Sequence, residues 1–213
     1  MHLDGFLADA ELGSDLLVHL PADDEIEHFP FARRERRQAN REVVLGDLLL
    51  MAAEDFLPDF PNARVMLWGD GPGRKALQGL AKRLRLKRVS FPGPTRDPMQ
   101  AYAAMDIFVN PARWEAGPYT VLEAMACGLP VVATDVAGNA DYVLHDETGL
   151  LTPPELPGPI AGALHPLLAD LDLRAAYGAA GRKRVESEFT LDRMLATTLA
   201  VYREVISERG MGE

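Results

Sequence analysis

The sequence predicts an α/β domain: a Rossmann-like, doubly wound parallel sheet followed by a helical C-terminal tail. From residue 43 onward, short apolar runs alternate with segments of helical periodicity. The runs are apolar throughout rather than at every second position, which is typical of parallel strands covered on both faces. After Pro153 only helical segments follow. Alternation of this kind indicates a parallel sheet with helices on both sides.

The expected strands are short and lie next to glycine or proline. The run RVMLW (64–68) ends at Gly69, which predicts a strand that leads into a turn. The same reasoning predicts four more strands, at 89–93, 107–111, 130–134 and 149–153.

The helices are expected from apolar spacing and from signals at their ends. Residues 43–57 suit a buried helix that Pro58 and Pro61 end. Asp97 supplies an N-cap, and Pro98 occupies the first helical position of the segment that follows. The remaining helices are expected at 73–86, 120–128, 157–170, 172–187 and 190–208.

On this basis we divide the chain into three parts. Residues 1–42 form an irregular, partly helical N-terminal extension, residues 43–188 the Rossmann-like domain, and residues 189–213 a C-terminal helix. The extension has an arginine-rich stretch at 33–37. We interpret this stretch as a solvated helical face, with a phosphate or partner site as the alternative.

The composition excludes several classes of protein. Among 213 residues, 22 are Lys or Arg and 32 are Asp or Glu, so the net charge of -10 argues against a general nucleic-acid or membrane-surface binder. The single cysteine, Cys127, excludes an internal disulfide framework. The acidic start lacks the basic region of a signal peptide, and the longest apolar stretch is too short to span a bilayer. We therefore expect a cytoplasmic protein without a transmembrane segment.

Ligands of a doubly wound sheet bind beyond the carboxyl ends of its strands. Three loops at those ends have unusual residues: 69–73, 111–120 and 134–141. The first, GDGPG, is close to a dinucleotide-binding pattern, but Arg74 stands where the last glycine is needed. This departure disfavours an NAD-type dehydrogenase. Gly71 is then either a ligand contact or part of a tight turn.

The second loop carries one glutamate and introduces a helix that carries another. Glu115 lies in the loop, and Glu123 follows about one turn inside the helix. Between them, Gly117 and Pro118 permit close approach to the helix start, whose unpaired N–H groups suit a diphosphate. This arrangement indicates a site for a sugar–diphosphate–ribose ligand. The alternative is a charge at a helix N-terminus together with a solvated glutamate.

The segment WEAGPYTVLEAMACGLPVVATDVAGNADYVLHDETGLL (114–151) resembles the signature segment of family 4 glycosyltransferases. That signature is a glutamate, seven residues, a second glutamate, an A-M-A-x-G-x-P-V-V-A run, a Gly-rich turn and a T-G-L-L strand. Upstream pieces match in the same order: ARVMLWGDGP, the VSFPG strand and AYAAMDIFVNP. The resemblance covers residues 55–208, and ordered motifs over this length are highly specific.

The resemblance implies one half of a GT-B fold, in which two Rossmann-like domains enclose the active site. This half is the C-terminal, donor-binding domain of a retaining enzyme that uses a UDP- or GDP-sugar, with neither a cofactor nor a bound metal. Glu115 would face the donor sugar as the catalytic carboxylate, and Glu123 would hydrogen-bond the ribose. Electrostatic stabilisation of the leaving diphosphate would be the main catalytic device. Backbone contacts to the sugar and diphosphate are expected from Gly117, Pro118, Tyr119 and Thr120.

The sequence departs from the family pattern in two places. Ala116, Gly117 and Pro118 stand where the family has G-F-G, which is expected to alter sugar selection. The family's basic pair on the diphosphate, in a G-R…K-G pattern, has its nearest match at 40–46. There Arg41 fills the first place as a possible phosphate contact, but Leu45 replaces the lysine. An equally good alignment places this stretch in the helix before the domain's first strand, so that strand and basic pair are both missing.

The chain has the length of one such domain plus its helical tail. We therefore expect a nucleotide-sugar binder whose transfer to a glycan or lipid needs an acceptor domain, on a partner chain or in a homo-oligomer. The alternative is a non-catalytic remnant or interaction module that keeps the fold. Leu45 favours that alternative, whereas the two glutamates favour the enzyme.

Overall fold

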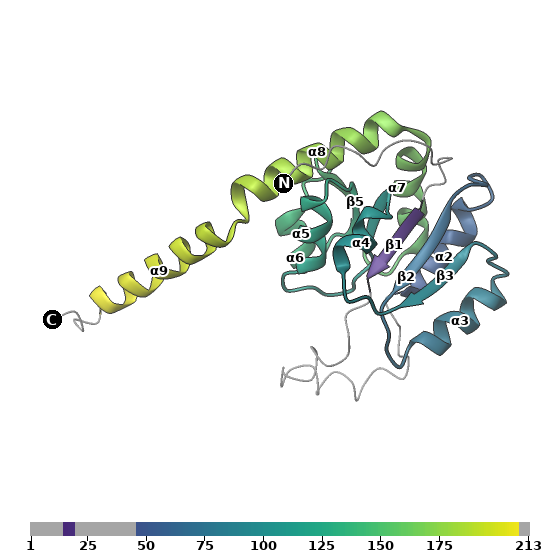
Figure 1. Ribbon diagram of the computed structural model, residues 1–213, viewed down its shortest axis with the longest axis horizontal. Coiled ribbons are helices and arrows are strands. Elements are labelled where there is room, and N and C mark those ends of the chain that lie inside the picture. Colours follow the sequence, from purple (N-terminus) through teal and green to yellow (C-terminus); the bar gives the residue numbers. More distant parts are fainter. Residues whose placement is uncertain (1–14, 20–45, 209–213) are drawn as a thin grey trace.

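The computed structural model describes residues 15–19 and 46–208, and within them six parallel strands form one sheet (Figure 1). The order from edge to edge is β3-β2-β1-β4-β5-β6. This is the strand order of a Rossmann sheet, so the predicted fold class is confirmed. The strands are β1 (Asp15–His19), β2 (Arg64–Trp68), β3 (Val89–Gly93), β4 (Ile107–Asn110), β5 (Val131–Thr134) and β6 (Gly149–Thr152).

β1 is a central strand that the sequence analysis missed. It pairs with β2 on one side, with Asp15 opposite Arg64, and with β4 on the other, with Leu16 opposite Ile107. The alignment in which the domain's first strand is missing is therefore wrong. A five-residue strand between two neighbours is held mainly by those neighbours, which a local pattern does not reveal. Arg41 lies outside the described residues.

The predicted helices are confirmed with ends shifted by a few residues, and one further helix is present. That helix is α6 (Ala137–Tyr142), in the segment that we expected to be a loop. Gly138, Asn139 and Asp141 are poor helix formers, so propensity gives no signal there. The other helices are α2 (Gly46–Phe56), α3 (Arg74–Arg83), α4 (Pro98–Ala103), α5 (Tyr119–Ala126), α7 (Pro157–Ala169), α8 (Leu171–Glu188) and α9 (Leu191–Glu208).

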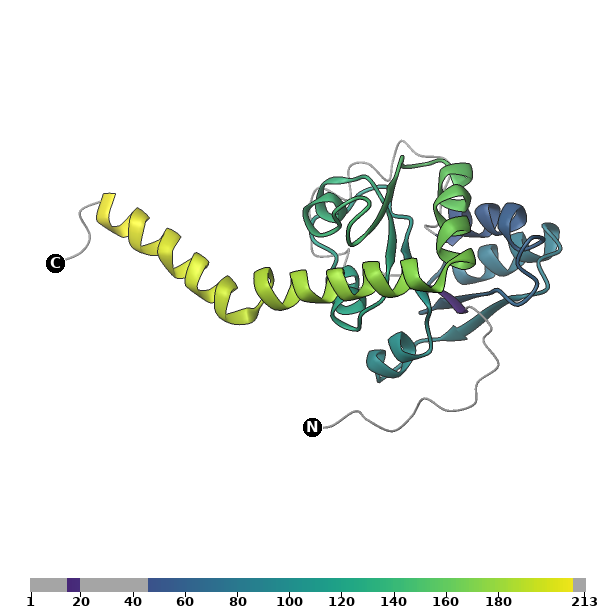
Figure 2. The same cartoon turned by 90° about the horizontal axis from the view of Figure 1, so that it is seen from above.

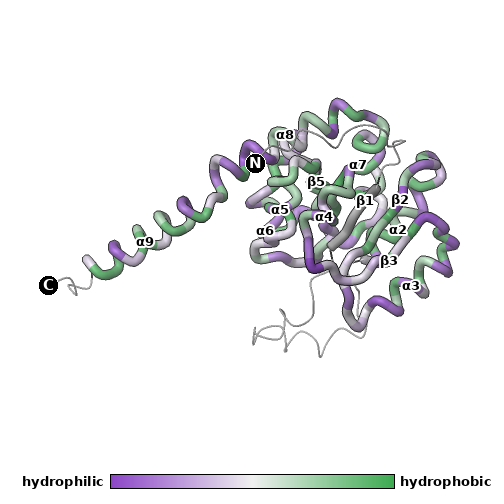
Figure 3. Tube along the Cα trace, in the orientation of Figure 1, coloured by the Kyte–Doolittle hydropathy of each residue, from purple (hydrophilic) through white to green (hydrophobic). Residues whose placement is uncertain are grey.

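Helices cover both faces of the sheet (Figure 1). On one face α2 and α7, both rich in hydrophobic residues (Figure 3), pack against strand residues such as Ile107 and Val132. On the other face α4 and α5 pack against the intervening residues, such as Phe108 and Val131. All residues of β4 and β5 are buried, which explains why these strands are apolar throughout.

The C-terminal helices differ in how they contact the domain. α8 packs against α5, and Gly178 permits this approach because a Cβ there would overlap the carbonyl oxygen of Gly128. α9 points away from the domain (Figures 1 and 2), and its side chains from Leu191 to Ser207 are exposed. No helix in residues 46–208 is long and apolar enough to cross a membrane. The large exposed apolar side chains of α9, here called the α9 stripe, are Leu191, Met194, Leu195, Leu199, Val201, Tyr202, Val205 and Ile206.

Candidate functional site

The strand order reverses direction between β1 and β4, and this switch point is where a doubly wound sheet binds its ligands. The loop that follows β4 runs from Pro111 to Pro118 and leads into α5. It contains Glu115 and Gly117, as predicted. The main candidate loop therefore follows the strand that borders the switch point. The segment that follows β1 lies outside the described residues.

A buried polar network holds the start of this loop. The Asn110 side-chain oxygen accepts a hydrogen bond from the Ala112 amide at 3.1 Å, and the Thr134 hydroxyl donates to the Ala112 carbonyl. Asn139 donates to the Thr134 carbonyl at 3.0 Å, which joins α6 to the same cluster. All three polar side chains are buried. Because buried polar groups are costly to leave unpaired, the network fixes the direction in which the chain leaves β4.

The middle of the loop lies directly against the first turn of α6. The Gly138 amide donates to the Glu115 carbonyl at 3.1 Å. A Cβ on Gly138 would come within 2.7 Å of the Gly117 nitrogen, so no larger residue fits there without moving the loop. On the other side, a Cβ on Gly117 would lie 3.0 Å from the Tyr142 hydroxyl. The two glycines therefore permit a tightly held loop that no spacing rule predicted.

Glu115 is half-buried at this position. Burial raises the pKa of its carboxyl group, and a side-chain hydrogen bond with Asn110 acts in the opposite direction. Trp114, the residue before it, is 76% exposed, and Tyr119, four positions after it at the start of α5, is 73% exposed. A half-buried carboxylate on a loop with exposed aromatic residues is typical of a binding site rather than of a core.

The segment from Gly117 to Thr120 forms the start of α5, where it was expected. Pro118 is the N-cap in an extended conformation, and Tyr119 and Thr120 are the first helical residues. The first N–H groups of a helix have no partner within the helix. They add a partial positive charge that favours an anion at this end. The structure therefore has a helix start that favours an anion four residues after Glu115.

Glu123 lies one turn further along α5, on an exposed part of the helix. The Tyr102 hydroxyl, from α4, donates to its Oε2 atom at 2.7 Å. Tyr102 is only 3% exposed, and burial together with this carboxylate raises the pKa of the phenol, so it remains a proton donor. Sequence spacing gave no signal for Tyr102, because it lies 21 positions before Glu123.

Gly71 lies beyond β2, in a turn that Arg74 braces. The Arg74 guanidinium donates to the carbonyl oxygens of Gly69 at 3.0 Å and of Phe91 at 2.6 Å. Its amide donates to the Gly71 carbonyl at 3.1 Å. The residue that breaks the dinucleotide pattern is therefore structural, and it ties the ends of β2 and β3 together. A ligand contact at Gly71 stays a prediction.

Arg113 is a basic residue beside Glu115 that the sequence analysis did not single out. Its side chain is 39% exposed, and its Nε atom lies 3.5 Å from Oε1 of Glu155. Burial raises the pKa of Asp47, in the first turn of α2, and the charge of Arg113 acts in the opposite direction. Arg113 thus lies at the carboxyl edge between α2 and the segment after β6. Within residues 46–208, no group of His, Cys, Asp and Glu side chains has the geometry to hold a metal ion.

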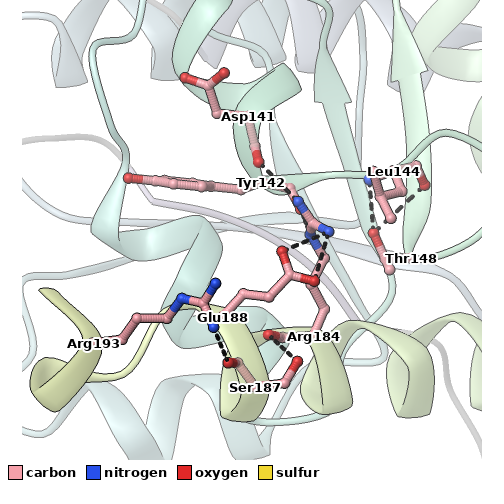
Figure 4. Close-up of polar contacts among 8 residues, drawn as sticks. All are labelled: Asp141, Tyr142, Leu144, Thr148, Arg184, Ser187, Glu188 and Arg193. Atoms are coloured by element: carbon pink, nitrogen blue, oxygen red, sulfur yellow. Dashed lines mark hydrogen bonds and ion pairs between the residues drawn. The ribbon is translucent and has the colours of Figure 1, made fainter. Parts of the chain in front are cut away.

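The far end of α6 is anchored by α8 (Figure 4). Arg184 donates to the carbonyl oxygen of Tyr142 at 3.1 Å and to that of Asp141 at 3.2 Å. Its guanidinium also pairs with Glu188 at 2.9 Å and lies over the ring of Phe189. The helix that supports the Glu115 loop is therefore fixed at both of its ends.

Sequence comparison gives the site a family context. A model of the family described as Glycosyl transferases group 1 matches residues 46–184, which include the β4–α5 loop and both glutamates. The D-inositol 3-phosphate glycosyltransferase of Jonesia denitrificans is 32% identical over 179 residues, which cover 81% of this chain and 42% of that protein. The chain spans about half or less of the length of the curated relatives that it matches.

Solved structures show the same fold. The C-terminal domain of the glycosyl transferase group 1 family protein LpcC from Francisella tularensis has a TM-score of 0.68 at 22% identity, covering 84% of this chain and 87% of that one. Anabaena Alr3699/HepE, solved in complex with UDP-glucose, has a TM-score of 0.68 at 25% identity, covering 88% of this chain and 49% of that one. The described fold thus matches nearly all of an isolated C-terminal domain.

Proposed function

The chain belongs to the glycosyl transferases group 1 family, and from this premise we propose that it binds a UDP- or GDP-sugar at the β4–α5 loop and serves its transfer to a glycan or lipid acceptor. The fold is that of the C-terminal, donor-side domain of GT-B glycosyltransferases. The proposal includes a family 4-like, retaining reaction without a cofactor or a bound metal, in the cytoplasm. HepE, a structural relative, was solved with UDP-glucose, which supports a sugar nucleotide as the ligand.

One observation carries this proposal: the start of α5, with its open N–H groups, lies between Glu115 and Glu123 at the switch point of the sheet. In our assignment the donor diphosphate lies at the helix start, where the partial positive charge favours it. Glu115 faces the donor sugar and Glu123 accepts hydrogen bonds from the ribose. Backbone groups from Gly117 to Thr120 contact the sugar and the diphosphate.

We assign part of the charge compensation for the diphosphate to Arg113. Within the described residues, it is the basic side chain on the loop that borders the switch point, two positions from Glu115. Arg74, which follows β2, already donates hydrogen bonds to two carbonyl oxygens. A guanidinium near the helix start would stabilise the leaving diphosphate as the glycosidic bond breaks.

The acceptor side is assigned to a second domain, on a partner chain, in a homo-oligomer or in a longer form of this chain. The α9 stripe supports this assignment, because its apolar side chains are exposed and the helix that carries them points away from the domain (Figure 2). Exposed apolar surface of this extent on one helix marks an interaction site. A second domain would hold the acceptor against the donor and exclude water from the reacting centre.

The test is calorimetric titration of the purified chain with UDP, GDP and ADP, followed by the corresponding sugar nucleotides. We expect binding of UDP or GDP with a Kd of about 10 µM to 1 mM, and measurable binding of the matching sugar nucleotide. Glu123→Ala is the site control. Absence of heat with all three diphosphates at millimolar concentration would reject the proposal in favour of a domain that keeps only the fold.

A further inference from the structure

We propose that Tyr102 is a positioning residue for Glu123: it holds the Oε2 atom of the carboxylate, so that Oε1 stays available to a ribose hydroxyl. The inference rests on the proposed function and deepens it, because it concerns how the site recognises ribose. The contact joins α4 to α5 and is a 2.7 Å hydrogen bond from the phenol to the carboxylate.

The two partners have very different surroundings. The ring of Tyr102 is 3% exposed and belongs to the core on the α4–α5 face of the sheet, with its centroid 6.0 Å from that of Phe108. Glu123 is exposed. A rigid core ring therefore presents its one polar atom to a side chain that would otherwise rotate freely. Holding a glutamate in advance removes part of the rotamer entropy that ligand binding must otherwise restrict.

The helix that carries Tyr102 is itself firmly placed. Asp97 caps α4, and its carboxylate accepts hydrogen bonds from the amides of Met99 at 3.1 Å and Gln100 at 3.4 Å. Pro98 occupies the first turn. These restraints fix the start of the six-residue helix and therefore the place from which the Tyr102 side chain extends. The position of the hydroxyl thus does not depend on Glu123, which is what a positioning role requires.

The chemistry of the pair suits this role at neutral pH. Burial, and then Glu123, raise the pKa of the Tyr102 phenol. The phenol therefore keeps its proton at neutral pH and donates a hydrogen bond to the carboxylate. A neutral donor on a carboxylate forms a charge-assisted hydrogen bond without cancelling the charge that ribose hydroxyls require. A lysine or arginine at this place would instead neutralise Glu123.

A contrasting interpretation is that the pair only ties α4 to α5. The chain offers a matched control for it. Tyr177, on α8, is half-buried and its hydroxyl is hydrogen-bonded to Asp146, in the turn before β6. Tyr177→Phe removes a tyrosine–carboxylate bond away from the β4–α5 loop. Tyr102→Phe removes one at Glu123 and keeps the buried ring.

The experiment compares UDP or GDP, whichever the wild-type chain binds, with its 2′,3′-dideoxy analogue. The measured quantity is the Kd of the dideoxy analogue divided by the Kd of the ribose form, and a larger ratio means stronger ribose recognition. We expect Tyr102→Phe to lower this ratio about 3- to 10-fold, and Tyr177→Phe to leave it unchanged. In a Glu123→Ala background, Tyr102→Phe should have no further effect on the ratio, since the group that it positions is absent.

Thermal unfolding is measured on every variant to separate folding from recognition. A Tyr102→Phe chain that loses stability as Tyr177→Phe does, with an unchanged Kd ratio, would overturn the inference and leave the proposed function standing. A wild-type chain that binds no nucleoside diphosphate would reject both. If Tyr102→Phe does not fold, 3-fluorotyrosine at position 102 replaces it: the more acidic phenol should raise the ratio, and an unchanged ratio counts against positioning.

Discussion

Replacing Gly138 by alanine perturbs the support of the loop that carries Glu115. A Cβ at this position would lie 2.7 Å from the Gly117 nitrogen and 2.9 Å from the Ala116 carbonyl carbon, whereas ordinary contact begins at 3.4 Å. One backbone must therefore retreat by about 0.7 Å, because neither atom can rotate away as a side chain does. Overpacking of this kind costs about 1–3 kcal/mol of unfolding free energy. The higher helix propensity of alanine offsets up to about 1 kcal/mol of this cost.

The same displacement should reduce donor binding. The loop on one side of this contact carries Glu115, which we assign to the donor sugar, while Glu123 lies one turn inside α5. The affinity for a sugar nucleotide should therefore fall more than the affinity for the nucleoside diphosphate alone. Misplacement of a binding group by about 1 Å can cost a factor of 100 in rate, and a smaller loss is expected for equilibrium binding. The assays are urea unfolding and calorimetry with UDP and UDP-glucose. If the chain prefers guanine nucleotides, GDP and a GDP-sugar replace them.

Gly162→Ala is the matched control. Gly162 lies inside α7, and nothing lies within 4 Å of the Cβ that alanine would add. Alanine there should raise the unfolding free energy by about 0.4–1 kcal/mol and leave both affinities unchanged. If Gly138→Ala behaved like Gly162→Ala in stability and in binding, the contact between α6 and the loop would not support the site, and the reasoning would be refuted.

Glu123→Ala should weaken nucleoside diphosphate binding by roughly 1.5–3 kcal/mol, whereas Glu115→Ala should matter only for the sugar-bearing donor; equal losses in calorimetry for both ligands would contradict these roles. Arg113→Ala should weaken UDP binding by about 1 kcal/mol and leave uridine binding unchanged, with Arg96→Ala as an exposed control. Because burial raises the pKa of Glu115 in the folded state, its stabilising contribution is full below its ordinary pKa of 4.5 and is lost as the pH rises through the folded-state pKa. Urea unfolding should thus show Glu115→Gln gaining stability over wild type at pH 7, a gain that disappears toward pH 4. The chain alone, incubated with radiolabelled donors and a panel of acceptors, should hydrolyse donor slowly; multiple-turnover transfer would show that no second domain is needed.

The sequence predicted the parts of the fold that local patterns encode. The buried strands β4 and β5 are apolar at nearly every position, and Asp97–Pro98 marks the start of α4. Patterns failed where long-range contacts decide the structure. β1 is held between β2 and β4, and α6 is held by Asn139 and by contact with the Glu115 loop, in spite of poor helix formers.

The residues of the candidate site likewise fall into those that a local pattern predicts and those that only long-range contacts identify. Glu115 and Glu123 could be proposed from the sequence because their spacing and the motif around them lie within one continuous segment. Tyr102 and Gly138 act on that segment from other elements, and their partners are identified only by distance. Arg74 was recognised as a break in a glycine pattern, but its contacts with the ends of β2 and β3 required the structure.

The loop of Glu115 and the junction between α8 and α9 contact the same group of side chains. The Tyr142 hydroxyl borders Gly117, and its ring packs edge-on against Phe189, with the centroids 5.0 Å apart. Phe189 is the C-cap of α8, two residues before α9 begins, and the Arg184 guanidinium lies over its ring. Arg184 also donates to the carbonyl oxygen of Tyr142 at the end of α6 (Figure 4). A chain of contacts therefore runs from the C-terminal end of α8, through the ring of Tyr142, to the loop that carries Glu115.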